Sequence, residues 1–190
     1  FPASIIVKVS ATSAPLDTDG DGIPDEQDTF DASNAIALEN GTGAVYTDSG
    51  LTLVLGDSAL NKGNAGIAVT EAEVASSGEG TGPSSFGSDS SYDYPGGLYD
   101  FKVSGLPVAG GTVNVVIPLS PAAPANAQYR KYTDLSGWTS FVSDTSNAVK
   151  TAAGASGACP QAGSASYQSG LTQGHTCLQL TIEDGGPNDA

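Results

Sequence analysis

Methionine is absent from this 190-residue chain, and cysteine, histidine, tryptophan and basic residues are scarce. Without an initiating methionine, the chain is expected to be a processed protein or a piece of a longer one. The chain has 6 basic and 21 acidic residues. Its formal net charge of −15 disfavours binding to nucleic acid or to anionic membrane surfaces. No run approaches the roughly 18 apolar residues that a membrane-spanning helix needs.

The scarcity of histidine and cysteine also limits the chemistry that the chain can perform. His175 is the single histidine and no Gly-x-Ser-x-Gly motif is present, so a Ser-His-Asp triad is not indicated. Cys159 and Cys177 lack CxxC partners, which argues against a zinc site. Their even number and the extracellular character of the sequence favour a disulfide, with two unrelated buried thiols as the alternative. We expect no enzymatic activity.

Glycine and proline, by contrast, are abundant, with 25 and 11 residues. This composition favours turns and short strands over long helices. A turn at 48–50 predicts a hairpin that joins 45–46 to 51–55. Residues 70–75 can form a helical turn, but Gly and Ser bracket them too tightly for a real helix. Residues 76–97 are expected to form a long loop. Further apolar runs predict strands at 4–10, 66–70, 98–103, 112–117, 127–133, 138–142, 148–151 and 177–182. Their spacing predicts an all-β fold, an antiparallel β-sandwich with Greek-key-like connections.

One segment of twelve residues, 17–28, carries the clearest chemical signal. Its five aspartates are Asp17, Asp19, Asp21, Asp25 and Asp28. Calcium takes six to eight oxygen ligands in flexible geometry, and alternate aspartates can turn their oxygens toward one centre. Gly22 permits the sharp bend, and the backbone carbonyl of Ile23 can add a ligand. The spacing therefore predicts that the five aspartates and Ile23 bind one Ca²⁺; the alternative is a solvated acidic linker.

The flanks of this segment differ from those of an EF-hand. Pro15 and Pro24 oppose helices on either side, and Asp28 stands where an EF-hand usually has Glu. The pattern D-x-D-x-D-G-x-x-D-x-x-D instead resembles the thrombospondin type 3 repeat of secreted bacterial proteins. That resemblance implies a calcium-stiffened linker.

The second half of the chain resembles a bacterial surface-protein domain, the choice-of-anchor U domain. The resemblance covers roughly residues 92–190. It is carried by the segments 94–101, 129–132, 137–141 and 170–186. It implies an exported protein and a position just before a C-terminal anchoring signal, hence an extracellular location at the bacterial cell surface. It implies no reaction and no catalytic residue.

Two features of this half leave alternatives open. The aromatic residues can supply core volume or form a sugar-stacking platform; they are Tyr94, Tyr99, Tyr129, Tyr132 and Trp138. The end of the chain, 183–190, has the composition of an opening calcium loop and equally that of a polar tail. A second calcium loop is therefore not favoured over a tail.

Together these observations predict an N-terminal strand (1–14), a calcium-binding linker (15–31) and a β-sandwich domain (32–190). The expected function is a calcium-stabilised surface module, adhesin-like or filament-forming; the alternative is a carbohydrate-binding module with a glycan ligand. Expected partners are further copies or neighbouring domains of the same surface protein. In the N-terminal strand, Ile5, Val7 and Val9 share one face, so the strand can fold back or add to the sheet edge of a neighbour.

Overall fold

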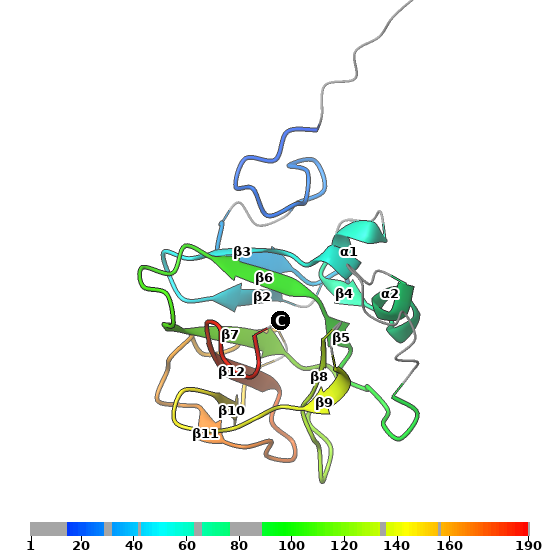
Figure 1. The fold of residues 1–190 in the computed structure, drawn as a ribbon, viewed down its shortest axis with the longest axis vertical. Helices are drawn as coiled ribbons and strands as arrows, with labels where there is room; N and C mark the ends of the chain where they lie inside the picture. The colour runs from blue at the N-terminus through cyan, green and yellow to red at the C-terminus, as the bar shows by residue number, and fades with distance from the viewer. Residues whose placement is uncertain are drawn as a thin grey trace, which may run out of the picture.

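The computed structural model describes residues 15–28, 32–41, 43–62, 66–76, 89–133, 136–155 and 157–189. Within them, short antiparallel strands stack in two layers, so the predicted all-β, sandwich-like fold is confirmed (Figure 1). The predicted N-terminal strand, 1–14, lies outside the described residues, as do 29–31 at the end of the predicted linker.

The larger layer is a six-stranded antiparallel sheet in the order β1-β2-β7-β12-β10-β11. Its centre is the pair β7 and β12, which match over seven residue pairs from Thr112–Glu183 to Pro118–Cys177. Long β-branched runs favour such central strands because both of their faces are covered. The six strands are β1 (Ala35–Ala37), β2 (Ala44–Thr47), β7 (Thr112–Pro118), β10 (Ala148–Ala152), β11 (Gln168–Ser169) and β12 (Cys177–Glu183).

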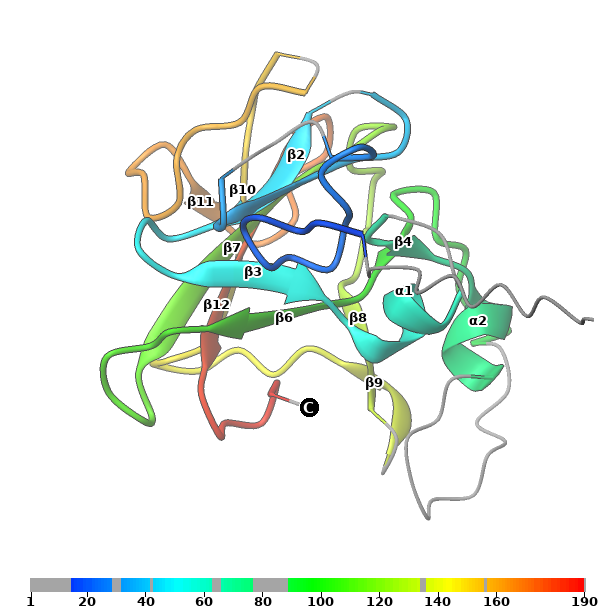
Figure 2. The same ribbon diagram turned by 90° about the horizontal axis from the view of Figure 1, so that it is seen from above.

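The opposite layer is built from β3 (Thr52–Leu55) and β6 (Phe101–Ser104), which cross over β7 and β12 (Figure 2). Two more strand pairs and two short helices complete the described elements. They are β4 (Ala68–Val69) with β5 (Leu98–Tyr99), β8 (Arg130–Thr133) with β9 (Gly137–Ser140), α1 (Asp57–Asn61) and α2 (Glu71–Ser76). In the described part of the chain, neither helix has the length or apolar character to span a bilayer.

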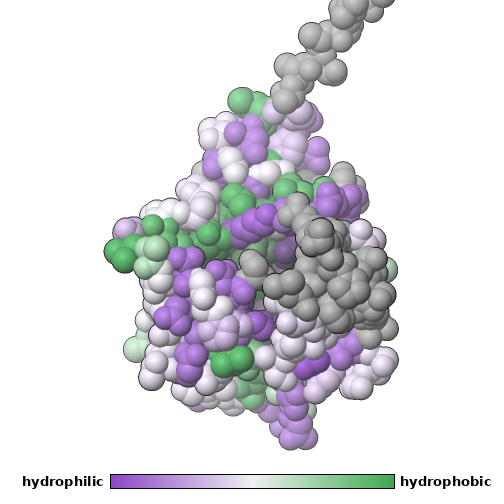
Figure 3. Space-filling view, viewed as in Figure 1, coloured by the Kyte–Doolittle hydropathy of each residue, from purple (hydrophilic) through white to green (hydrophobic). Residues whose placement is uncertain are grey.

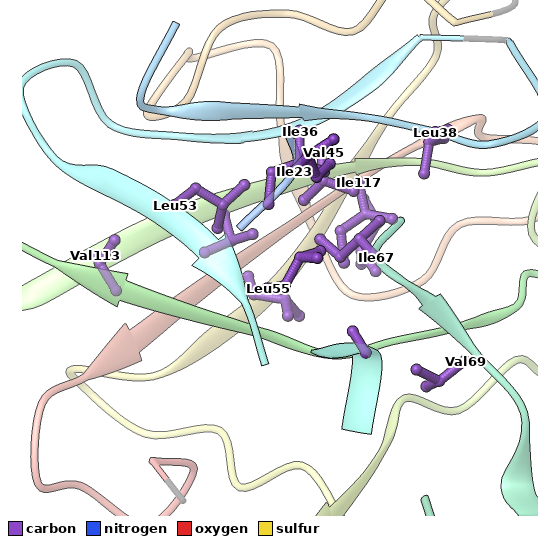
Figure 4. Close-up of a cluster of buried hydrophobic side chains, with 14 of the residues drawn as sticks. Ile23, Ile36, Leu38, Val45, Leu53, Leu55, Ile67, Val69, Val113 and Ile117 are labelled. Atoms are coloured by element: carbon purple, nitrogen blue, oxygen red, sulfur yellow. The ribbon is translucent and has the colours of Figure 1, made fainter. Parts of the chain in front are cut away.

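The core lies between the layers and follows from strand alternation. Every second residue of β7 turns the same way, and its cross-strand partner on β12 turns with it, as in the pairs Val115–Leu180 and Ile117–Leu178. From the other layer, Leu53 and Leu55 close the core (Figure 4). All six residues are at most 3% exposed.

The outer face of the large sheet is covered as well, which explains why β12 is buried on both sides. Cys177 on this face forms a disulfide with Cys159, at an S–S distance of 2.07 Å, as the sequence predicted. The covering loop is tied down by two tyrosine hydroxyls: Tyr46 and Tyr167 each donate a hydrogen bond to the carbonyl of Pro160, both at 2.7 Å. The disulfide thus fastens a loop that seals the sheet.

Two local predictions were wrong. The expected hairpin around 48–50 does not form, because β2 pairs with β1 and β7 while β3 pairs with β6. The turn instead carries the chain between layers, and the Asp48 carboxylate accepts the Asn114 N–H of β7 at 2.7 Å. At 71–76 a helix does form, since Thr70 and Glu73 make reciprocal capping hydrogen bonds that offset its short length.

Candidate metal centre

The loop 15–28 projects at one end of the molecule, beyond β3 (Figure 1). It is nevertheless fastened to the sandwich: the N–H of Leu55 donates to the carbonyl of Asp21 at 2.9 Å. Ile23 is 4% exposed and belongs to the core cluster (Figure 4). Gly22 has a φ of +97°, a left-handed conformation that glycine adopts without strain. The aspartates on either side of it are therefore held by a loop of fixed shape.

Three of the predicted ligands come together in this loop. Carboxylate oxygens of Asp17, Asp19 and Asp21 lie within 4.8 Å of one another. Backbone N–H groups orient them: Asp17 accepts from Gly20 at 2.8 Å and from Gly22 at 3.1 Å. Asp21 accepts with Oδ1 from the N–H of Ile23 at 2.7 Å. Such turns leave one oxygen of a carboxylate available for another partner.

The remaining oxygens indicate what that partner is. The Oδ2 atoms of Asp19 and Asp21 are buried and have no hydrogen-bond partner, and Asp21 is 0% exposed. Burial raises the pKa of Asp21 to about 7 against the lowering effect of the Ile23 N–H, and neighbouring aspartates raise it further. Burial likewise raises the pKa of Asp19. Buried carboxylates are stable only when paired or bound to metal, so the three aspartates fit a cation and can hold a metal ion.

The other predicted ligands take different positions. Asp25 lies across the loop, where its two oxygens accept the N–H and the hydroxyl of Thr18, both at 2.7 Å. Asp28 is close enough to Asp19 and Asp21 that its charge raises their pKa values. Direct ligation by Asp25, Asp28 and the Ile23 carbonyl stays a prediction.

The tail after β12 uses its acids differently. Asp184 accepts the N–H of Gly110 at 2.8 Å, and Asp189 accepts the N–H of Gly185 at 2.8 Å. These carboxylates are therefore occupied in fastening turns. Among the described residues, the loop 17–21 holds the one group of three acidic or other ligating side chains close enough to share an ion.

The aromatic residues of the second half pack against the core. Trp138 lies 5.2 Å from Tyr94 and 5.3 Å from Tyr132 between ring centroids, and it contacts the main core cluster. Sequence reasoning missed the ion pair beside them: Arg130 Nε donates to Asp89 at 2.7 Å, and its guanidinium lies 4.5 Å from the Tyr92 ring centroid. The packing of Trp138, Tyr94 and Tyr132 agrees with a core role for these aromatic residues. A sugar-stacking role stays a prediction.

Replacing Arg130 by alanine is expected to lower the free energy of unfolding by about 1–2 kcal/mol, because Asp89 would lose its charged hydrogen-bond partner. Both side chains are 12% exposed, so water compensates little. Lys150→Ala, which removes a cation of β10 that forms no ion pair with described residues, is the control and should change stability by less than about 0.5 kcal/mol. Equal losses in urea unfolding for both variants would contradict the importance of the pair.

No protein-family model matches this chain, and searches of curated protein sequences and of solved structures found no match. The resemblances of 17–28 and 92–190 stay predictions. The function is therefore inferred from the geometry of the site.

Proposed function

We propose that the protein is a structural module of the bacterial cell surface in which the loop 17–28 binds one Ca²⁺. The observation that carries this proposal is the pair of buried, unpartnered oxygens, Oδ2 of Asp19 and Oδ2 of Asp21. The Oδ1 atom of each of these two aspartates accepts a hydrogen bond from a backbone N–H. The loop is therefore folded around a position that needs positive charge.

Calcium suits this position better than other common cations. The available ligands are oxygens only, and hard oxygen ligands select Ca²⁺ or Mg²⁺ over the softer transition metals. Mg²⁺ demands near-ideal octahedral geometry and usually keeps several waters, whereas Ca²⁺ accepts irregular sites with more ligands. Three clustered aspartates, with Asp25, Asp28 and the Ile23 carbonyl in the same loop as further candidate ligands, offer such a site.

The bound ion would act on the junction between the sandwich and whatever precedes Pro15. Asp21 is hydrogen-bonded to β3 through Leu55, and Ile23 is anchored in the core, so a metal-bound loop becomes a rigid extension of the sandwich. An adhesin-like or filament-forming surface protein requires such stiffness. The disulfide and the strongly acidic surface support an extracellular location.

The test compares Asp21→Asn with wild type in calcium and in EDTA. Calcium at a hundredfold excess over its dissociation constant should stabilise wild type by about 2.7 kcal/mol in urea unfolding. The Asp21→Asn variant should lose most of this gain. In EDTA it should be more stable than wild type, because it removes a buried charge that repels Asp17 and Asp19.

Glu26→Gln is the matched control, because Glu26 is an exposed acid of the same loop outside the three-residue cluster. It should bind calcium like wild type in titration calorimetry. The calcium proposal fails if wild type shows no binding heat and no stabilisation, or if Asp21→Asn and Glu26→Gln behave alike.

A further inference from the structure

A cavity of about 910 Å³ lies between the two layers. Its floor is the inward face of β7 and β12, including Val115 and Leu180. One wall is the inward face of β6, and aromatic side chains of the β8–β9 pair line the cavity as well, with Tyr132 and Trp138 among them. The cavity opens to the surface, so it is a groove rather than an interior void, and its largely apolar lining suits an occupant with apolar side chains.

The same cavity borders an open strand edge. The N–H groups of Leu53 and Leu55 donate to Ser33 and Asp21, away from β6. The pairs of β3 and β6 that exchange hydrogen bonds are therefore Thr52–Ser104 and Val54–Lys102. It follows that the backbone groups of Phe101 and Val103 point to the other edge of β6. In the part of the chain that the structure describes, β3 is the one strand that pairs with β6.

The side chains at the open edge of β6 are also incompletely covered. Phe101 and Val103 face the core but remain only partly buried, whereas Leu53 and Leu55 of the neighbouring strand are fully buried. Figure 3, in the view of Figure 1, shows hydrophobic residues reaching the surface between the hydrophilic parts of the two layers. An extended segment beside β6 would pair its open backbone groups and fill the cavity with alternate side chains.

We propose that this β6 groove, the cavity together with the open edge at Phe101 and Val103, accepts residues 4–10 of a second copy of the chain. The inference rests on the proposed function as a surface module. In the segment Ser4–Ser10, Ile5, Val7 and Val9 alternate with Ser4, Ile6, Lys8 and Ser10, three of which are polar. Seven residues in a strand span about 23 Å, so the segment is long enough to pass along all four residues of β6. Ile5, Val7 and Val9 would enter the cavity, and Ile6 and Lys8 would face outward.

The position of the metal loop favours a second copy over the chain's own segment. Across the upper layer, the loop carrying Asp21 lies on one side of β3, and β6 with its open edge lies on the other. The loop also projects away from β8 and β9 at the end of the molecule (Figure 1). Residues 11–14 can span at most about 14 Å. Crossing from the loop side of β3 to the open edge of β6 already takes about 10 Å, or two strand spacings, of this reach of about 14 Å. The segment must then still pass around the layer.

Donation from one copy to the next uses different surfaces on the two partners. Such a head-to-tail contact does not close on itself and builds linear assemblies. The metal loop, held by Ile23 and Asp21, would set the angle between successive copies.

The test uses two full-length variants that differ by one position. Val7→Asp places a charge on the face that enters the groove, whereas Ile6→Asp places the same charge on the outward face. With calcium present, wild type and Ile6→Asp should form linear assemblies in negative-stain microscopy and light scattering. Val7→Asp should stay monomeric.

A synthetic peptide of residues 1–14 gives a second measurement. Val7→Asp protein still has its own groove, so it should bind the wild-type peptide one to one and change the fluorescence of Trp138, which lines the cavity. A peptide with Val7→Asp should bind at least about 100-fold more weakly. If the Val7→Asp protein does not fold, the nearly isosteric Val7→Thr variant replaces it and should assemble less than wild type.

Three results would overturn the proposal: assembly of Val7→Asp at wild-type levels, loss of assembly in Ile6→Asp to the same degree, or a wild-type protein that is monomeric at high concentration with calcium. The last result, with a destabilised Val7→Asp, would indicate that the segment occupies the groove of its own chain. Calcium binding is measured separately by calorimetry on the same proteins. Failure of the groove with calcium binding intact leaves the proposed function standing, and absent calcium binding refutes that function whatever the assembly state.

Discussion

Replacing Leu55 by alanine is expected to lower the free energy of unfolding by about 3 kcal/mol and to weaken calcium binding as well. Leu55 is 2% exposed, so its removal leaves a cavity that the core cannot fully close. It also supports the metal loop. The Leu55 side chain belongs to the same core cluster as Ile23 of the loop, and alanine would keep only the backbone bond from Leu55 to the carbonyl of Asp21. The loop should lose part of its fixed shape in the variant.

Leu180→Ala is the matched control for this prediction. Leu180 is 1% exposed and belongs to the same core, but it lies on β12 in the opposite layer. The two variants should lose similar stability in EDTA, measured by urea unfolding. Only Leu55→Ala should show a larger calcium dissociation constant in titration calorimetry. Wild-type calcium affinity in both variants would show that the shape of the loop does not depend on the Leu55 side chain.

The strands of the large sheet could be predicted because their sequences are long and apolar. β7 and β12 begin at the predicted residues and extend one residue further than predicted. β1 has three residues and β11 two, and such short segments carry no periodicity that could identify them. The sequence also could not predict to which layer each strand belongs. The turn after β2 has the composition of a hairpin, but it changes layers through a contact with Asn114, 66 residues away.

The helices show both kinds of failure. The signal for α2, a Thr with a Glu three residues later, was present in the sequence and corresponds to a capping box. α1 has no comparable local signal. Its first N–H groups, of Ser58 and Ala59, donate to the carboxylate of Asp100, which lies between β5 and β6, at 2.7 and 3.2 Å. A cap supplied from so far along the chain depends on the tertiary fold.

Some features of the metal loop could likewise be predicted from the sequence and others could not. Spacing alone placed Asp17, Asp19 and Asp21 around one centre, since alternate residues next to a sharply bent glycine turn their carboxylates inward. The burial of Asp21 could not be predicted, because it results from the packing of the loop against β3. The engagement of Asp25 by Thr18 was hidden for a similar reason: the hydrogen bonds exist only once the loop is folded.

Removing the disulfide by the double change Cys159→Ala and Cys177→Ala is expected to lower the free energy of unfolding by about 3 kcal/mol. The bond joins residues 18 positions apart, and a cross-link of this length restricts the unfolded chain by about that amount. The enclosed segment contributes few apolar side chains of its own; Tyr167 is the one large buried side chain in it. Without the bond, the part of the segment before β11 would be held over the sheet mainly by hydrogen bonds to Pro160 and from Gly163 to Gln179.

Hydrogen exchange should locate the effect. In the double variant, amides near Cys159 should exchange faster first, because hydrogen bonds from Tyr46 and Tyr167 to Pro160 then replace a covalent link there. The far end of the segment stays paired to β10 through β11 and should respond less. Amides of β7, at the centre of the sheet, should change only with global stability. Wild type treated with reductant, with both thiols shown by alkylation to be free, is the control and should match the double variant apart from the small volume lost at Cys177. Equal urea midpoints for oxidised wild type and the double variant would show that the packing of Tyr167 and Val116 suffices to hold the loop.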